Sequence, residues 1–330
     1  MAIYRLISES TDGWMNLAVD EFLLGRQKTD DVILYFYVNK NAVIIGRNQN
    51  AWRECRLDAM ERDGVRLVRR HTGGGAVYHD EGNLNFSFIT GERSYSLDRQ
   101  MGVIRRAVER FGIKTELSGR NDVLADGRKF SGNAYGLRGN MRAHHGTLLV
   151  NSDMAKLGGY LNVSEKKLRA KGVESVRSRV INLSELCPDI TAQALREAVL
   201  DEFEKEYGSS SELKLEENEH REIERLYREQ ASWEWRLGKT PEFDVMVSER
   251  LSFGEFELLL TLRGAAVDEA KMHTDALDTE LSHIVCDAIC GKRFDRAEIA
   301  DALFETGVPQ AAEIAEYILA KGFFTGEING

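Results

Sequence analysis

Three consecutive glycines at positions 73–75 constrain this chain more than any other feature. They follow an apolar segment that ends in Arg69 and Arg70, and an alternating apolar segment resumes at Ala76. Positions without a side chain let the backbone approach a ligand closely and adopt a positive φ. Successive N–H groups in such a turn form a concavity that suits an anion, and the two arginines can neutralise one. Taken alone, however, the glycines also fit a flexible hairpin turn.

A second segment rich in glycine and polar residues spans 118–134 and reads Ser-Gly-Arg-Asn-Asp-Val-Leu-Ala-Asp-Gly-Arg-Lys-Phe-Ser-Gly-Asn-Ala. Asp126-Gly127 within it predicts a hairpin turn, and Lys129 follows that turn. Glycines before and after the lysine leave backbone room beside its ammonium group. Because a lysine at the end of a hairpin is often only solvated, a surface role and a functional role both remain open.

Periodic patterns predict the elements around these segments. Asp12 is placed to cap a helix with an apolar face. The segments 32–38 and 42–45 predict two strands of a hairpin. Residues 97–111 predict a helix, and 84–90 predicts a strand with alternating polar and apolar residues.

The order, spacing and flanking residues of both glycine-rich segments resemble lipoate–protein ligases, which are members of the biotin/lipoate–protein ligase family. The similarity also includes stretches at 14–18, 46–50, 144–149, 171–180 and 232–235. The resemblance implies an enzyme that activates lipoate with ATP as lipoyl-AMP and releases pyrophosphate. The lipoyl group would then pass to the ε-amine of a lysine on a carrier domain.

The resemblance implies an α+β fold in which mixed β-sheets are flanked by helices, with a small C-terminal α/β accessory domain. We place the catalytic domain, which would bind lipoate and ATP, at 1–246 and the accessory domain at 247–330. A chain of 330 residues suits one large domain and one small one. In the C-terminal part the sequence predicts two strands around Arg263-Gly264 and two or three short helices.

The resemblance assigns the catalytic role to Lys129, which would contact both the lipoyl carbonyl and the phosphate. A mobile point charge suits this double contact better than a planar guanidinium. The residues that the resemblance implies for ATP are Arg70, Gly75, Ala76, Val77, Tyr78 and Lys129. Those implied for lipoate or lipoyl-AMP are Gly73, Gly74, Gly75, His79, Lys129, Ser131 and Gly132.

Several of these assignments have a simpler structural alternative. Arg70 could form a salt bridge at the rim of the loop, although the adjacent glycines favour a phosphate contact. Asp122 is the candidate ligand for Mg²⁺, because magnesium on a nucleotide typically uses one or two carboxylates; the alternative is an Asx-turn. The histidines show no metal-binding spacing. Structural roles are favoured for His79, His144 and His145, and among the three His79 is the first candidate for an exception.

Composition excludes some classes of protein. The net charge of −10 argues against general nucleic-acid binding, which needs a clustered positive field. No segment approaches the ~18 apolar residues of a membrane span, and the N-terminus lacks the layout of a secretion signal. The four cysteines, Cys55, Cys187, Cys286 and Cys290, form no CxxC pair, which favours free thiols in a reducing compartment. We expect a cytoplasmic monomer that binds neither nucleic acid nor membrane.

The expected partners are lipoate, ATP with Mg²⁺, and the lipoyl carrier domains of 2-oxoacid dehydrogenase complexes, the glycine cleavage H protein, or both. Alternative functions remain open. An octanoyl- or lipoyltransferase of the same fold would use a cysteine thioester, which needs an activated thiol, and neither Cys55 nor Cys187 lies in a glycine-rich segment. A biotin ligase or a non-catalytic relative that binds carriers would share the fold. The presence of Arg70, the glycines and Lys129 argues against lost activity.

Overall fold

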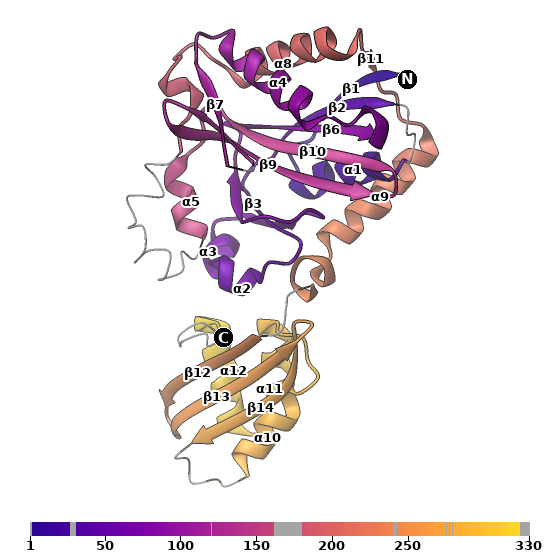
Figure 1. Cartoon of the computed structure of the whole chain (residues 1–330). Coiled ribbons are helices and arrows are strands. Elements are labelled where there is room, and N and C mark those ends of the chain that lie inside the picture. Colours follow the sequence, from indigo (N-terminus) through magenta and orange to yellow (C-terminus); the bar gives the residue numbers. More distant parts are fainter. Residues whose placement is uncertain are drawn as a thin grey trace. The chain divides into compact units, whose positions relative to one another are not determined.

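The computed structural model describes residues 2–26, 31–119, 121–161, 180–239, 243–274, 276, 278 and 280–323. Residues 171–179, which carry part of the resemblance, lie outside the described residues. Contacts within the chain separate two compact units, Met1–Arg47 with Glu54–Trp235, and Asn48–Arg53 with Arg236–Gly330 (Figure 1). The predicted fold of mixed sheets flanked by helices is confirmed.

An eight-stranded mixed sheet forms the framework of the first unit (Figure 1). Its strand order is β11 (Ser211–Glu212), β1 (Ile3–Ile7), β2 (Val32–Val38), β6 (Asn83–Gly91), β10 (Met141–Leu149), β9 (Arg128–Arg138), β8 (Asp122–Ala125) and β7 (Thr115–Ser118). The pairs that join β11, β1 and β2 are parallel, and those from β2 through to β7 are antiparallel. All nine residues of β6 are buried, so both faces of the sheet are covered at its centre.

One face of this sheet packs against α4 (Leu97–Glu109) and α8 (Ala192–Tyr207) (Figure 1). The helix predicted at 97–111 is confirmed as α4. The caps Ser96 and Thr191 each accept a hydrogen bond from a backbone N–H three residues on, which satisfies one of the free donors at each helix start. The core on this face contains the buried rings of Phe36, Phe86, Phe88, Phe130 and Phe203.

The other face packs against α1 (Gly13–Gly25) and a smaller sheet. This sheet has the order β4 (Arg66–Arg69), β3 (Ala42–Ile45) and β5 (Val77–His79). Asp12 caps α1 as predicted, since its carboxylate accepts a hydrogen bond of 2.9 Å from the backbone N–H of Trp14. Helix α9 (Glu217–Ala231) covers the outer side of α1.

The segments 32–38 and 42–45 are both strands, but the predicted hairpin between them is wrong. β2 pairs with β1 and β6, whereas β3 pairs with β4 and β5 in the smaller sheet. Because both edges of β2 are already occupied, the chain leaves the large sheet at 39–41. Asn41 takes a positive φ of 47° in this crossing, and the side chain of Asn39 is completely buried.

A buried arginine ties β4 to the end of the first unit. The guanidinium of Arg69 donates hydrogen bonds to the carbonyl oxygens of Arg47 (2.8 Å) and Trp235 (3.0 Å). The indole N–H of Trp235 donates back to the Arg69 carbonyl at 2.7 Å, and the indole stacks on the ring of His71 at 4.2 Å. Burial lowers the pKa of Arg69 to about 10. The guanidinium is therefore charged at neutral pH, and the carbonyl oxygens offset its desolvation.

Short helical elements lie in the connections of the first unit and at its two junctions with the second unit, near 48–53 and at 235–236. These are α2 (Ala51–Glu54), α3 (Leu57–Arg62), α5 (Met154–Tyr160), the 3₁₀ turns Glu92–Ser94 and Leu183–Glu185, and a π-helical turn at Glu234–Gly238. No helix in the described ranges is long and apolar enough to cross a membrane.

The second unit contains an antiparallel sheet and helices that follow it in the chain. The elements are β12 (Phe243–Leu251), β13 (Gly254–Arg263), β14 (Ala266–Thr274), α10 (Leu281–Ile289), α11 (Arg296–Glu305) and α12 (Pro309–Lys321). The predicted strands around Arg263-Gly264 are confirmed as β13 and β14. β12 is not among the predicted elements and crosses residue 246, whereas contacts divide the chain between Trp235 and Arg236. The domain boundary at residue 246 therefore stays a prediction.

The packing around Gly146 gives a test of the core. A Cβ at this position would lie 2.6 Å from the fully buried ring of Phe86 and 2.5 Å from Oδ1 of Asn133. Because neither neighbour has room to withdraw, Gly146→Ala should lower the free energy of unfolding by about 1–3 kcal/mol in chemical denaturation. Gly158→Ala in α5, where a Cβ meets nothing within 4 Å, is the control and should raise it by up to about 1 kcal/mol, because alanine favours the helix more than glycine does. Equal stability of the two variants would contradict this packing.

Candidate active site

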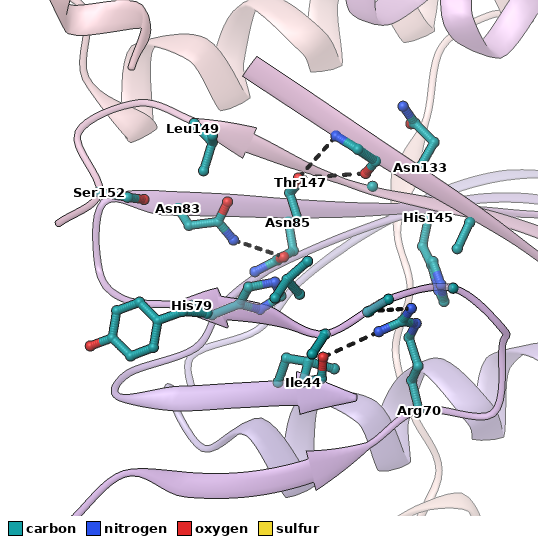
Figure 2. A pocket seen from close by; sticks show the side chains of 18 of the residues that line it. Ile44, Arg70, His79, Asn83, Asn85, Asn133, His145, Thr147, Leu149 and Ser152 are labelled. Carbon is teal, nitrogen blue, oxygen red and sulfur yellow. Dashed lines mark hydrogen bonds between the residues drawn. The ribbon is translucent and has the colours of Figure 1, made fainter. Parts of the chain in front are cut away.

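A cavity of about 310 Å³ in the first unit brings the two glycine-rich segments together (Figure 2). Strands of both sheets line it. The predicted site residues among its lining are Arg70, Gly74, Gly75, Ala76, Val77, Tyr78, His79, Lys129 and Gly132. Residues far apart in the sequence, and predicted separately for nucleotide and acyl group, therefore share one site.

Three predicted residues lie outside this lining. The carbonyl of Gly73 accepts hydrogen bonds from Arg70. Ser131 is completely buried, and its hydroxyl accepts a hydrogen bond of 3.3 Å from Asn133. Asp122 contacts the cavity through Lys129.

The side chain of Arg70 holds the glycine loop. Its guanidinium donates to the carbonyl of Gly73 from Nε (3.1 Å) and Nη2 (2.8 Å), to Gly75 from Nη2 (2.9 Å) and to Ile44 from Nη1 (3.3 Å; Figure 2). Gly74 has a φ of 104°, and a Cβ there would lie 2.6 Å from Nη2, so the position requires glycine. Desolvation lowers the pKa of Arg70 to about 10, which leaves the group charged at neutral pH. Within the described residues its hydrogen bonds go to carbonyl oxygens, not to a carboxylate at the rim.

A β-bulge directs Lys129 into the cavity. In the β8–β9 pair, Val123 lies opposite Ser131 and Leu124 lies opposite Lys129, so that Phe130 has no partner. Both Phe130 and Ser131 are buried as a result. Lys129 lies on the other face of the sheet, on the same side as Gly132. Bulges commonly re-aim a side chain next to a functional site.

Lys129 forms an ion pair with Asp122, with 2.6 Å between Nζ and Oδ1. Asp122 lies directly opposite Gly132 in the ladder. A Cβ on Gly132 would come within 2.8 Å of Nζ and 2.9 Å of Cε of Lys129. The absence of a side chain at Gly132 therefore leaves the path along which the lysine reaches the carboxylate.

Asn121 and Asn133 fix the strand that carries Asp122. Each amide donates to the other residue's backbone carbonyl, at 2.9 and 3.0 Å. Oδ1 of Asn133 in turn forms a buried hydrogen bond of 2.8 Å with Nε2 of His144. The carboxylate and the lysine are thus supported by a network that runs from the exposed Asn121 to the buried Asn133 and His144, which is what a precisely placed site needs.

The metal assignment of Asp122 has limited support from geometry. No group of three or more His, Cys, Asp or Glu side chains in the described part of the chain could hold a metal ion. Asp122 supplies one carboxylate, one oxygen of which contacts Lys129. A single carboxylate suits a Mg²⁺ ion whose other ligands are phosphate oxygens and water. Asp122 could therefore be one ligand of an ion that a nucleotide brings with it, but it could not hold the ion by itself.

The structural interpretation of His144 agrees with its surroundings. The ring is completely buried and has partners at both nitrogens, Asn133 at Nε2 (2.8 Å) and Gln100 at Nδ1 (3.1 Å). Burial lowers the pKa of His144 to about 3, so the ring is neutral. His145 contacts Thr72 and Asp20.

Sequence reasoning missed the polar wall that β6 contributes. Asn83 donates to Oδ1 of Asn85 at 3.0 Å, and Asn85 donates to the carbonyl of Tyr37 at 3.2 Å (Figure 2). Oδ1 of Asn83 and Oγ of Ser152 are buried at the cavity, and neither has a hydrogen-bond partner among the described residues. The alternation of polar and apolar residues at 84–90 is the available signal, since a central strand covered on both faces has no solvent side for its polar residues.

A second cavity of about 250 Å³ adjoins the first, because both are lined by Leu17, Arg70 and His145. Its apolar lining also contains Leu24, Leu137 and Ala143. Its polar lining includes Asp20, Glu21, His71 and Thr72. The two cavities together offer charged groups and an apolar lining on either side of these shared residues.

Comparison with known protein families gives two matches. Residues 12–204 match the model of the lipoyl protein ligase A/B catalytic domain, and residues 240–316 match that of the bacterial lipoate protein ligase C-terminus. A curated relative, lipoate-protein ligase A of Psychrobacter cryohalolentis, is 36% identical over 339 residues, and the match covers 100% of both chains.

Solved structures show the same similarity. LipL1 of P. falciparum in complex with lipoate has a TM-score of 0.65 and 28% identity, covering 97% of this chain and 100% of that one. A bipartite lipoate protein ligase of Thermoplasma acidophilum, described with its E2 lipoyl domain, has a TM-score of 0.66 and 31% identity, covering 72% and 97%. A lipoate-protein ligase A bound with ATP has a TM-score of 0.63 and 29% identity, covering 72% and 100%.

The close approach at Gly132 gives a test of the site geometry. Gly132→Ala should push the lysine ammonium away from Asp122, because the end of a flexible side chain yields more easily than backbone. An ion pair between partly exposed groups contributes about 1 kcal/mol or less, so the melting temperature should change little. Amine-directed labelling followed by mass spectrometry should show faster modification of Lys129, with Lys114 as the internal reference. An unchanged labelling ratio would contradict the contact.

Proposed function

The chain belongs to the lipoate–protein ligase family, and we propose that it activates lipoate with ATP as lipoyl-AMP before transferring the lipoyl group to a lysine. The observation that carries this proposal is the single cavity that brings Lys129, Arg70 and the glycine loop together. The relative bound to lipoate and the relative bound to ATP support the choice of substrates.

The chemistry explains why a charged, glycine-lined cavity is needed. A carboxylate does not acylate an amine usefully at neutral pH, so it needs a leaving group, which AMP provides. The lipoate carboxylate attacks the α-phosphorus of ATP, and the bond to pyrophosphate breaks. Negative charge on the α-phosphate must be stabilised in this step and again when the carrier amine displaces AMP. In our proposal the ammonium of Lys129 meets that charge and the lipoyl carbonyl, because its stem is mobile and its contact with Asp122 is exchangeable.

The glycine loop is the proposed site for the ATP phosphates. Gly75, Ala76, Val77 and Tyr78 would present backbone groups to the nucleotide, and Gly73 and Gly74 leave space for close approach. The guanidinium of Arg70 would exchange some of its carbonyl partners for phosphate oxygens, which form stronger charge-assisted bonds. Asp122 would hold the Mg²⁺ ion that accompanies the nucleotide.

The second cavity is the proposed site for the aliphatic part of lipoate. It adjoins the Lys129 cavity at shared residues and offers the apolar side chains of Leu24, Leu137 and Ala143. His79, Ser131 and Gly132 stay proposals for contacts with lipoate or lipoyl-AMP. Among them, Ser131 is more suited to supporting the bulge, since its hydroxyl is buried against Asn133.

The acceptors that we propose are lipoyl carrier domains of 2-oxoacid dehydrogenase complexes, the H protein, or both. A relative described with its E2 lipoyl domain supports the first of these. We also propose that the protein acts in the cytoplasm as a monomer, with a catalytic domain at 1–246 and an accessory domain at 247–330. Its free cysteines agree with a reducing compartment.

An acyl-thioester mechanism is less well supported. It would need an activated thiol, and burial raises the pKa of Cys55 to about 12, which makes its thiolate scarce. No cysteine is part of the lining described for the Lys129 cavity. These observations favour the adenylate route over a cysteine-based transferase.

Lipoate-dependent exchange between ATP and pyrophosphate tests the proposal. Lys129→Ala should lower the exchange rate by about 10²–10³-fold, because it removes a preorganised charge from the transition state. Lys114→Ala, at an exposed position away from the cavity, should exchange at the wild-type rate. Thermal melts should show both variants folded, since Lys129 is about a third exposed.

The same assay separates the alternatives. Exchange that depends on biotin instead of lipoate would indicate a biotin ligase. Acyl transfer to a carrier without ATP would indicate a thioester mechanism, and a folded wild-type protein with neither activity would indicate a non-catalytic relative. Near-normal exchange in Lys129→Ala would remove the assignment of that lysine.

A further inference from the structure

One ring nitrogen of His79 has no hydrogen-bond partner in the part of the chain that the structure describes. The side chain is 4% exposed and lies on the wall of the Lys129 cavity (Figure 2). Nδ1 lies 3.1 Å from Nδ2 of Asn39, whereas Nε2 is buried and makes no hydrogen bond. His144 differs, since both its nitrogens have partners. A buried polar atom left unpaired destabilises a protein, so Nε2 of His79 is placed for a ligand that completes it.

A chain of hydrogen bonds from the backbone determines which nitrogen carries the proton. Nδ2 of Asn16 lies 3.0 Å from the carbonyl oxygens of both Ser10 and Val38, so this atom must be the amide nitrogen. Its two hydrogens are shared with a third acceptor, Oδ1 of Asn39 at 2.9 Å, and Asn39 presents its oxygen there because two amide nitrogens at this distance would repel each other. The nitrogen of Asn39 then faces His79, whose Nδ1 has to accept.

The other side of Asn16 is compatible with this orientation. Its Oδ1 accepts hydrogen bonds from the hydroxyls of Ser8 (2.6 Å) and Tyr35 (3.2 Å). Asn16 and Asn39 are both completely buried, so water does not compete for these contacts. The carbonyl oxygens of Ser10 and Val38 therefore determine the orientation of both amides.

The ring of His79 is neutral as well as oriented. Burial, with Arg70 and His145 as nearby charges, lowers the pKa of His79 to about 3. A neutral imidazole carries one proton, and with Nδ1 accepting from Asn39 this proton is on Nε2. The cavity therefore offers a neutral N–H donor at this point.

We propose that Asn39 is a positioning residue that holds His79 in the Nε2–H tautomer, so that the ring donates a hydrogen bond to an acceptor atom of the bound acyl-adenylate. This inference rests on the proposed function for the ligand, but the tautomer follows from the protein alone. It gives Asn39, which lies in the crossing between the two sheets, a role in ligand binding that its sequence context does not indicate.

The tautomer can be measured directly in the full-length protein. Long-range ¹H–¹⁵N correlation spectra of histidine-labelled protein should show Nε2 of His79 protonated and Nδ1 unprotonated at neutral pH. Addition of a lipoyl-sulfamoyl adenosine, a non-hydrolysable analogue of lipoyl-AMP, should shift the Nε2–H resonance. A proton on Nδ1 in the wild-type protein, or no shift on binding, would overturn the inference without any variant.

Asn39→Asp tests the positioning role. The carboxylate still accepts from Asn16 but now also accepts from Nδ1, so the His79 proton moves to Nδ1. Affinity for the analogue, measured by calorimetry, should then follow the protonation of Nε2. An unprotonated Nε2 should weaken binding by at least about tenfold, since a hydrogen bond is replaced by two facing acceptors. An imidazolium, which keeps the donor, should bind at least as tightly as the wild type.

Asn41→Asp is the matched control. It places the same charge in the same crossing and keeps the acceptor for the hydroxyl of Tyr78, so affinity and tautomer should both be unchanged. Loss of the Nε2 proton in Asn39→Asp without loss of affinity would overturn the inference while leaving the proposed function intact. A wild-type protein that does not bind the analogue at all would instead overturn the proposed function.

Discussion

The burial of both faces of the central strands is the constraint on which the rest of the first unit depends. Polar side chains on a strand such as β6 have no water beside them, so any hydrogen bond they make must be to the protein or to a ligand, and within the described residues Oγ of Ser87 and Oγ1 of Thr90 make none. Asn83 and Asn85 instead form a chain of hydrogen bonds that begins at a backbone carbonyl of β2. A similar chain leads through Asn16 to His79. Both chains end at the cavity in an atom without a partner among the described residues, so the contacts that stabilise the core also set the polarity of the site.

The two cations of the cavity are held in opposite ways. Arg70 spreads its donors over three backbone carbonyls and fixes the loop between β4 and β5. Lys129 has one carboxylate partner and a stem that passes over a glycine. A planar, multiply bonded group suits a fixed phosphate site, whereas a single ammonium on a flexible stem can follow charge as it develops. The number of hydrogen-bond partners around Arg70 and Lys129 therefore agrees with the chemistry of each side chain.

The sequence predicts those features that depend on local chemistry. Asp126 and Gly127 form the predicted turn, both with positive φ, and Asp12 caps its helix. Features that depend on which strands meet could not be predicted. The hairpin of 32–38 with 42–45 fails because neighbours from elsewhere in the chain occupy both edges of β2. The bulge at Phe130 changes the face on which Lys129 lies, and a period-two pattern contains no signal for it.

The reciprocal bonding of Arg69 and Trp235 has a mechanical consequence. The longer segment of the second unit begins at Arg236, so tension in the chain at this point acts on Trp235. The hydrogen bonds between this residue and Arg69 transfer the load to β4, and β4 continues directly into Arg70 and the glycine loop. A pull at this point would thus act on the glycine loop, which is the proposed phosphate site, as well as on α9, which immediately precedes this segment in the chain. The first unit therefore has this anchor within a few residues of its proposed reaction centre.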